Sequence, residues 1–486
     1  MANKLRQYLA KQTHLLPLFL LLLIGIVLRF YRFEAFVTFL GDQGRDAIVI
    51  KRILTLEHLP AIGAPTSVGQ IYLGPFYYYF MAPWLALFRL NPLGLAFGVA
   101  FFSCLYILVN YLIVEELFGR FVAFLSSIFI TLSVTLINFS RFSWNPNLLP
   151  LFSLLTVYFV IKSLSNYKWW FFALAGICLS FSIQLHYLAL FLLPPLGVFF
   201  LIKLFEEKKK RRSVVIGFII LTVFFLIASF PLVVFDLRHN FLNLKNFLGL
   251  FKTSSAISSN KLTAIFNTFL ILNAYSFNVR LNLFLSSIIL LLIAISFIFL
   301  IKRKDNLRTI LLFFILCLLG ISLYSGPKNV HYFGSLYPFY YIILAYFLSL
   351  LKPSLWGKAT IVAFVLIYFY LNFQSYYFLF NKGNYQIEKA QAIASKIFHS
   401  IDKPKYSVTQ LPVRYSDSTM RYFLEIWGKR PLEKDSLVKA DELFVICETK
   451  CFPVIGNPQW DIAYFAARKI AQTQEVDGVK IYKLVR

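Results

Sequence analysis

Two carboxylates and an arginine lie close together in the segment Gly41-Asp42-Gln43-Gly44-Arg45-Asp46, just after the first long apolar run of the chain. Asp42 and Asp46 are four residues apart, so a short helix starting at Gly41 would place them on one face, beside Arg45. A carboxylate held in this way can take a proton from a bound hydroxyl group, and a neighbouring cation favours its ionised form. A plain helix cap made by Asp42 is the non-catalytic alternative.

A second polar cluster follows a late apolar run, in the segment from Ser325 to Tyr332. Lys328, His331 and Tyr332 supply a cation and hydrogen-bond donors, which suit a lipid-linked phosphate at the depth of the headgroups. Arg141, in the loop after an earlier apolar run, could pair with a phosphate or with an Asp of the first loop. The alternative for all of these side chains is an ordinary place at the membrane surface, reaching toward the headgroups.

Aromatic residues crowd the stretch 72–84 and could form a wall for a sugar ring or a lipid chain. The wall candidates are Tyr72, Tyr77, Tyr78 and Trp84. The belt of Tyr and Trp that flanks membrane helices explains the same composition. Asp236, Arg238 and His239 form a further mixed cluster with a less defined role, and we interpret His186 as an ordinary interfacial residue.

These clusters lie in a chain of 486 residues that is 59% hydrophobic and only 14% charged. Apolar runs of about 20 residues, the length that spans the hydrocarbon core as a helix, recur almost to residue 380. A helix can cross a bilayer because it satisfies its own backbone groups. We therefore predict an integral membrane protein. The net charge of +26 does not indicate nucleic-acid binding, because Lys and Arg gather at the ends of apolar runs, where they face lipid headgroups and the cytoplasm.

The positions of the basic residues predict the orientation of the chain. Basic residues before residue 12 place the N-terminus inside, and the basic stretch 203–212 marks another inside loop. An odd number of crossings must therefore join the outer segment 31–71 to residue 203. We interpret 71–90, which carries Gly74, Pro75 and Pro83, as an outer juxtamembrane or re-entrant helix that does not cross. The C-terminus then lies outside a cytoplasmic (inner) membrane.

Counting crossings so that each basic loop lies inside gives about eleven membrane-spanning helices. They are predicted at 15–30, 94–114, 120–139, 147–164, 168–186, 188–203, 214–235, 281–301, 308–325, 333–351 and 359–379.

The chain changes character near Asn381, because more than half of its 22 acidic residues follow that point. A helix-like segment, 387–401, precedes strand-like runs, which predicts a small extracytoplasmic α/β domain over 381–486 after a membrane module over 1–380. Cys447 and Cys451 lie four residues apart in this domain, and a disulfide and two free thiols both fit the spacing. The cysteine spacings are not those of a zinc site.

In order and spacing, these features resemble the GT-C membrane glycosyltransferases. The resemblance rests on an acid soon after the first helix, a juxtamembrane stretch rich in Pro and Tyr, a Ser-Arg loop, a late Lys-His-Tyr segment followed by Leu-Tyr-Pro, and a terminal outer domain. It covers most of residues 1–380 and is greatest to the protein O-mannosyltransferase and aminoarabinose-transferase branch. It implies the GT-C fold and an inverting transferase that moves a sugar from a polyprenyl-phosphate donor to a glycan, lipid or protein acceptor at the outer face.

The resemblance also implies roles for individual residues. Asp42 is expected to be the general base, with Asp46 and Arg45 orienting the base or the acceptor. Lys328, His331 and Tyr332 are expected to hold the donor phosphate.

The chain departs from the family pattern at two places. Many relatives have an acid directly after the first-loop Asp, where this chain has Gln43, and an acid in the second outer loop, where it has Asn145 and Asn147. We therefore expect no obligatory metal, although a divalent ion bridging Asp42 or Asp46 to the phosphate stays open.

Two other classes of protein are alternatives. A polysaccharide polymerase or ligase would hold a polyprenyl diphosphate with Arg and His and would not specially need Asp42. A lipid or solute transporter would place charged groups deep inside its helices, and the apolar runs carry almost none.

Overall fold

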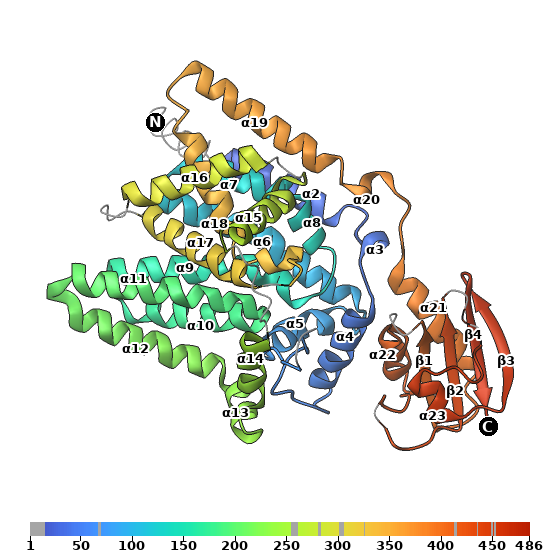
Figure 1. The fold of residues 1–486 in the computed structure, drawn as a ribbon. Helices are drawn as coiled ribbons and strands as arrows, with labels where there is room; N and C mark the ends of the chain where they lie inside the picture. Colours follow the sequence, from blue (N-terminus) through green and yellow to red (C-terminus); the bar gives the residue numbers. More distant parts are fainter. Residues whose placement is uncertain are drawn as a thin grey trace, which may run out of the picture.

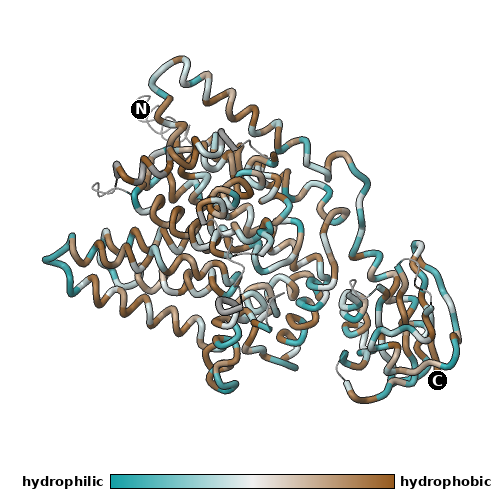
Figure 2. The backbone as a smooth tube through the Cα atoms, in the orientation of Figure 1, coloured by the Kyte–Doolittle hydropathy of each residue, from teal (hydrophilic) through white to brown (hydrophobic). Residues whose placement is uncertain are grey.

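The computed structural model shows a large bundle of helices with a small α/β domain at one end (Figure 1). Apolar residues run along most helices of the bundle, and polar residues gather at helix ends and over the small domain (Figure 2). This architecture confirms the predicted fold class. The structure describes residues 15–66, 70–253, 261–279, 283–300, 306–324, 326–412, 416–434, 436–448, 451 and 453–486.

Six helical segments in the described ranges are long and apolar enough to cross a membrane, and five shorter apolar helices accompany them. The six are Leu93–Phe118, Asn145–Asn166, Tyr187–Glu206, Lys208–Ala228, Asn306–Leu323 and Leu355–Phe373. The bundle contains, in chain order, α2 (Leu15–Phe30), α6 (Leu93–Phe118), α7 (Arg120–Leu132), α8 (Val134–Phe139), η1 (Asn145–Leu148), α9 (Leu149–Asn166), α10 (Trp169–Leu185), η2 (Tyr187–Leu192), α11 (Leu193–Glu206), η3 (Lys208–Lys210), α12 (Arg211–Ala228), α13 (Phe230–Arg238), α14 (Leu242–Thr253), α15 (Lys261–Phe277), α16 (Leu283–Leu300), α17 (Asn306–Leu323), η4 (Val330–Phe333), α18 (Tyr337–Ser349), α19 (Leu355–Phe373) and α20 (Tyr377–Phe380).

The helix α15 lies in a segment that the sequence analysis placed outside the membrane, so the predicted count of eleven is not confirmed. Phe269 and Leu272 of α15 are fully buried in the main core. Polar residues interrupt the apolar pattern of this helix, which is why it was missed. Inside the bundle they have partners, because Asn273 Nδ2 donates to Ser286 Oγ at 3.1 Å and the Tyr340 hydroxyl donates to Asn273 Oδ1.

Two predicted crossings are broken into shorter helices. The crossing expected at 120–139 divides at Ser133 into α7 and α8, and the one expected at 214–235 divides at Ser229 into α12 and α13. The last carbonyls of α7 are satisfied by side chains from other parts of the chain, as a buried helix end requires. Arg29 donates to the Ile130 carbonyl at 3.1 Å, and the Tyr376 hydroxyl donates to the Leu132 carbonyl at 2.6 Å.

Three helices follow α2 before the next long apolar helix: α3 (Phe33–Phe36), α4 (Gly41–Leu54) and α5 (Phe76–Leu87). In Figure 1, α4 and α5 lie at the end of the bundle that faces the small domain. The 12 residues of α5 are too few to span the hydrocarbon core, which takes about 20. The segment read as non-crossing therefore forms a short helix with one side buried, including Tyr77 and Tyr78.

The small domain holds a four-stranded sheet in the order β1-β2-β4-β3. The pair β1–β2 is parallel, and the pairs β2–β4 and β4–β3 are antiparallel. Its elements are α21 (Gln386–His399), β1 (Tyr406–Leu411), α22 (Ser418–Ile426), β2 (Glu442–Cys447), α23 (Trp460–Phe465), β3 (Lys469–Val476) and β4 (Val479–Val485). The boundary predicted near residue 380 falls between α20 and α21.

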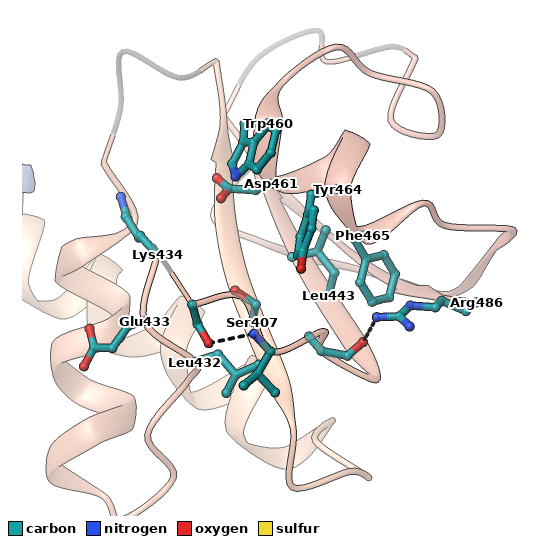
Figure 3. A pocket seen from close by; sticks show the side chains of 13 residues that line it. Ser407, Leu432, Glu433, Lys434, Leu443, Trp460, Asp461, Tyr464, Phe465 and Arg486 are labelled. Carbon is teal, nitrogen blue, oxygen red and sulfur yellow. Dashed lines mark hydrogen bonds between the residues drawn. The ribbon is translucent and has the colours of Figure 1, made fainter.

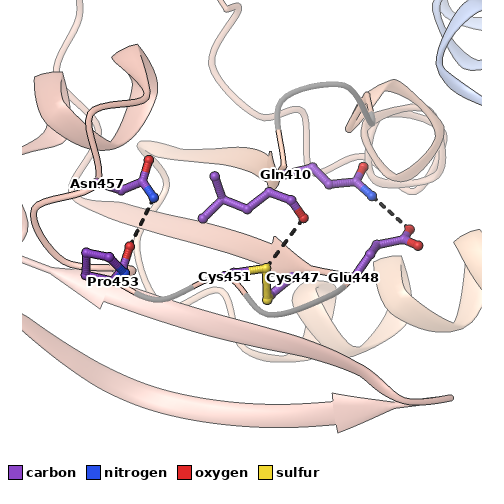
Figure 4. Close-up of a disulfide and its surroundings, with 7 residues drawn as sticks. Gln410, Cys447, Glu448, Cys451, Pro453 and Asn457 are labelled. Carbon is purple, nitrogen blue, oxygen red and sulfur yellow. Dashed lines mark hydrogen bonds between the residues drawn. A yellow bond between two sulfur atoms is a disulfide. The ribbon is translucent and has the colours of Figure 1, made fainter.

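A shallow pocket opens in the small domain beside α23 (Figure 3). Trp460 and Tyr464 stack along its rim, with ring centroids 5.4 Å apart. The spacing of Cys447 and Cys451 left their state undecided, and the structure joins them in a disulfide at the end of β2, with Cα atoms 5.9 Å apart (Figure 4).

The small domain is docked on α4 through α22. A Cβ atom on Gly44 would lie only 2.5 Å from the backbone N of Thr419, so the two helices touch backbone to backbone. Arg52 of α4 makes a two-pronged ion pair with Glu425, whose side chain is 5% exposed; Nε and Nη2 lie 2.9 and 2.8 Å from the carboxylate oxygens. Because α4 carries the acidic candidates, the small domain helps to fix their position.

Candidate functional site

The helix α4 begins at Gly41, as the spacing of the acids requires, and collects an acid cluster of Asp42, Arg45, Asp46 and Tyr78. Arg45 bridges the two carboxylates: its Nη2 lies 2.8 Å from Asp46 Oδ1, and its Nη1 lies 2.9 Å from Asp42 Oδ1. The Tyr78 hydroxyl, from α5, donates to Asp46 Oδ1 at 3.0 Å. The first turn of α4 is capped by Gln43, whose Oε1 accepts from the Leu40 amide at 3.0 Å. The Asp42 carboxylate bonds Arg45.

The two carboxylates differ in access to solvent. Asp46 is completely buried, whereas the side chain of Asp42 is 53% exposed. Burial raises the pKa of Asp46, and the charge of Arg45 opposes this rise. Asp46 Oδ2 has no hydrogen-bond partner among the described groups. Asp42 is thus the carboxylate that a substrate can reach, and Asp46 is placed to hold Arg45.

The four aromatic wall candidates do not form one surface. Tyr77 and Tyr78 lie beside the acid cluster, and the Tyr77 hydroxyl is 2.5 Å from Ser143 Oγ. Trp84 packs instead on the α6 side chains Phe97 and Phe101, at 5.9 and 5.1 Å between ring centroids.

Tyr72 lies apart from the other three, with its ring 6.2 Å from Phe235 of α13. Of the four candidates, Tyr77 and Tyr78 therefore form hydrogen bonds at or near the acid cluster, whereas Tyr72 and Trp84 pack on neighbouring helices.

A histidine cluster forms where three helix ends meet, and it consists of Trp144, His186, His331 and Tyr332. The His331 ring lies 4.5 Å from Trp144 and 5.3 Å from His186, measured between ring centroids. Tyr332 lies 5.3 Å from His186. Burial lowers the pKa of His331 to about 4, and burial together with the charge of His331 lowers the pKa of His186 to about 3. Both rings are therefore neutral near pH 7.

Sequence reasoning took His186 for an ordinary interfacial residue, and the structure places it in this cluster instead. Its only local signal was a single histidine at the end of an apolar helix. A sequence does not reveal which helix ends meet in space, so the pairing with His331 could not be predicted.

The acid cluster and the histidine cluster are joined by one hydrogen bond and one loop. Tyr77 directly precedes the acid partner Tyr78 on α5, and its hydroxyl bonds Ser143. Ser143 is next in sequence to Trp144, which contacts His331. The second outer loop thus connects the two predicted sites.

Lys328 turns toward the end of α17. Its Nζ donates to the Tyr324 carbonyl at 2.8 Å, and burial lowers its pKa. A cation at a helix C-terminus is favoured by the exposed carbonyls there. The predicted phosphate role of Lys328 would therefore have to share this amine with Tyr324.

Arg141 does not join the predicted phosphate residues. Its guanidinium lies over the Phe378 ring at 3.9 Å, and its Nη2 donates to the Leu28 and Tyr31 carbonyls at 2.9 and 3.1 Å. The residue is 1% exposed. The buried guanidinium thus caps the end of α2. Its Nε and Nη1 have no hydrogen-bond partner among the described residues, and the phosphate role of Arg141 stays a prediction.

The mixed cluster after α13 is also explained by helix capping. Asp236 accepts hydrogen bonds from the amides of Asn243 and Leu244, at 2.8 and 3.1 Å, in the first turn of α14. Arg238 and His239 are exposed. His239 Nδ1 lies 2.8 Å from the Phe235 carbonyl in its own helix.

Among the described residues, no three His, Cys, Asp or Glu side chains are grouped as a metal ion would need. The pocket beside α23 is lined by none of the predicted site residues. The candidate site is therefore the pair of clusters at the end of the bundle.

Comparison with known proteins supports this assignment of the fold. Residues 73–233 match the family described as dolichyl-phosphate-mannose-protein mannosyltransferase. The crystal structure of ArnT from Cupriavidus metallidurans bound to undecaprenyl phosphate is similar with a TM-score of 0.64 and 14% identity, over 96% of this chain and 97% of that one. No curated protein matches the sequence significantly.

A second solved structure is similar over part of its length. It is the archaeal oligosaccharyltransferase AglB from Archaeoglobus fulgidus in complex with an inhibitory peptide and a dolichol-phosphate, with a TM-score of 0.55 and 14% identity. The similarity covers 87% of this chain and 64% of that one. The predicted resemblance to the mannosyltransferase and aminoarabinose-transferase branch of the GT-C glycosyltransferases is confirmed, and so is the GT-C fold.

Proposed function

We propose that this protein is an inverting membrane glycosyltransferase, which moves a sugar from a polyprenyl-phosphate donor to a glycan, lipid or protein acceptor at the outer face of the cytoplasmic membrane. The N-terminus would lie inside and the small domain outside. The observation that carries the proposal is the pairing of an exposed, oriented carboxylate with a cluster of uncharged donors, linked through Tyr77 and Ser143. The carboxylate suits the activation of a hydroxyl nucleophile, and the uncharged donors suit the binding of a departing phosphate.

In this mechanism Asp42 is the general base. Its carboxylate takes the proton of the acceptor hydroxyl as that oxygen bonds to the anomeric carbon. Arg45 fixes the carboxylate, and buried Asp46 with Tyr78 fixes Arg45. Holding the base in place before the reaction removes the need to order it in the transition state.

The phosphate leaves on the opposite side of the sugar ring. As the anomeric carbon–oxygen bond breaks, its electron pair stays on the phosphate oxygen, where His331 and Tyr332 would donate hydrogen bonds. Lys328 would add a positive charge nearby. Attack from the side opposite the leaving group inverts the anomeric centre. If a divalent ion takes part, the exposed Asp42 carboxylate is the residue that would hold it, and the ion would supply further charge neutralisation.

The first test is transfer of radiolabelled sugar from a panel of polyprenyl-phosphate donors, in membranes that carry wild type or Asp42→Asn. We expect Asp42→Asn to lose about 100-fold or more of the activity, the usual contribution of a positioned base. The control is Asp477→Asn, because Asp477 sits in an exposed turn of the small domain at φ 49°, which Asn also adopts.

Two outcomes would contradict the proposal. Full activity in Asp42→Asn would remove Asp42 as the base and favour a polymerase or ligase. No transfer from any donor of the panel by wild type would point to a diphosphate donor, and the same membranes would then be assayed with polyprenyl diphosphate sugars.

A further inference from the structure

His186 is held in one orientation by a local hydrogen bond. It lies between α10 and η2 in extended backbone, with φ −162° and ψ 129°. Its Nδ1 accepts a hydrogen bond from the Leu188 amide at 3.2 Å. A neutral imidazole that accepts at Nδ1 carries its proton on Nε2. The ring therefore presents an N–H donor on the side away from the Leu188 amide.

That donor has no partner inside the described part of the protein. The Nδ1 contact is the single hydrogen bond of the His186 side chain there, and neither His186 nor His331 takes part in an ion pair. The two rings lie 5.3 Å apart, tilted by 67°, with Tyr332 at 5.3 Å from His186. A cluster of neutral donors without a carboxylate is suited to receive an anion.

We propose that His186 is a further ligand of the donor phosphate, with its Nε2–H donating to a phosphate oxygen beside His331 and Tyr332. This inference rests on the proposed function, because it names a residue of the same phosphate site. In this interpretation, the hydrogen bond from the Leu188 amide to His186 Nδ1 orients the ring so that Nε2–H can donate to the phosphate.

The charge change in the reaction explains why such a donor would help catalysis. The phosphate of the sugar donor is a diester with one negative charge, and transfer converts it to a monoester that carries about −1.5 to −2 at neutral pH. A fixed N–H donor interacts more strongly with the product charge than with the starting one. His186 should therefore affect kcat more than the KM of the donor.

Two substitutions separate the capping role from the donor role. In His186→Asn the amide oxygen can replace Nδ1 and accept from Leu188, but no group remains at the Nε2 position. In His186→Gln the amide nitrogen reaches the Nε2 position and keeps a donor there. His399→Asn is the matched control, because His399 is exposed in the small domain and its Nδ1 lies 2.7 Å from the Ser395 carbonyl of its own helix.

The experiment measures kcat and KM for transfer, together with the Kd of each variant in nanodiscs for polyprenyl monophosphate. We expect His186→Asn to lower kcat by about 100-fold, as the loss of one donor to a developing oxyanion does, and to weaken monophosphate binding. His186→Gln should recover most of both values, and His399→Asn should match wild type. The thermal midpoint of each variant is measured in parallel.

Several results would overturn the inference. Wild-type kcat and Kd in His186→Asn would show that the Nε2 donor has no role. Equal losses in the Asn and Gln variants would show that ring shape matters and the donor does not. If the Asn variant fails to fold, a Gln variant that folds but does not bind monophosphate would count against the donor. Wild type that does not bind polyprenyl monophosphate would instead overturn the proposed function itself.

Discussion

Opposite charges face each other in the acid cluster, whereas the histidine cluster holds neutral rings. Arg45 lies within 2.9 Å of both Asp42 and Asp46. In contrast, burial alone lowers the pKa of His331, and burial together with His331 lowers the pKa of His186, with no contribution from a carboxylate among the described residues. The acid cluster thus contains its own counter-charge in the free protein. The histidine cluster is suited to an anion that the protein does not itself provide.

The two clusters also differ in how they are held. The three charged residues of the acid cluster sit on one helix, α4, which is packed between α5, the helix of Tyr78, on one side and α22 of the small domain on the other. The histidine cluster comes from three chain turns at helix ends, where short 3₁₀ segments replace regular helix. A rigid base and a more adjustable phosphate site would suit a reaction in which the phosphate must bind, gain charge and leave.

Breaking the internal charge balance of the acid cluster should give the largest effect. In Asp46→Asn the carboxylate that holds Arg45 is lost, and removing one partner of a buried ion pair costs on the order of 3 kcal/mol. We expect a lower thermal midpoint in detergent and a loss of sugar transfer of more than 100-fold, because Asp42 loses its fixed partner.

The double variant Asp46→Asn with Arg45→Gln sharpens this test. It removes both charges, so stability should recover in part while transfer stays lost. Wild-type stability in Asp46→Asn alone would show that the buried pair does not hold α4.

The contact between α4 and the small domain should have the next largest effect. Gly44→Ala places a Cβ atom 2.5 Å from the Thr419 amide nitrogen and 2.6 Å from the Ser418 carbonyl carbon, so α22 must move. We expect about a tenfold loss of kcat, an estimate for a small displacement of a positioned group, with little change in the affinity for polyprenyl monophosphate.

Gly197→Ala is the control for this prediction, because a Cβ atom there meets nothing within 4 Å. Equal loss of kcat and of monophosphate affinity in Gly44→Ala would mean that the displacement reaches the histidine cluster as well. The acid cluster and the histidine cluster would then not be held in place independently of each other.

The sequence predicted what depends on residue type and local spacing. The helix start at Gly41, the grouping of Asp42 with Asp46, and the Lys-His-Tyr segment could be located because each lies within a few consecutive residues. The apolar runs likewise predicted most of the bundle, because a helix of about 20 apolar residues is long enough to cross the hydrocarbon core.

What the sequence could not predict depends on partners far away in the chain. The capping role of Arg141 could not be predicted, because the α2 carbonyls that it caps lie more than 100 residues earlier. The polar residues of α15 disguised a buried helix, since Asn273 finds partners in α16 and α18. The one local sign in the sequence that α22 docks on α4 is Gly44, which has no side chain to separate the two backbones.

The smallest expected effect is a pH dependence of stability that belongs to the histidine cluster. His in an unfolded chain titrates near pH 6.5, whereas burial lowers the pKa of His186 to about 3 and of His331 to about 4. Between about pH 6.5 and pH 4 the unfolded state takes up protons that the folded state does not, so the free energy of unfolding should fall as the pH falls.

The measurement is the thermal midpoint of wild type and His186→Gln from pH 7.5 to 4.5. The variant should lose less stability over this range, while His399→Asn should follow wild type. Parallel curves for wild type and His186→Gln would mean that the pKa of His186 is the same in the folded and the unfolded chain. Burial would then not keep this ring neutral below pH 6.5, and the contrast with the acid cluster would be wrong.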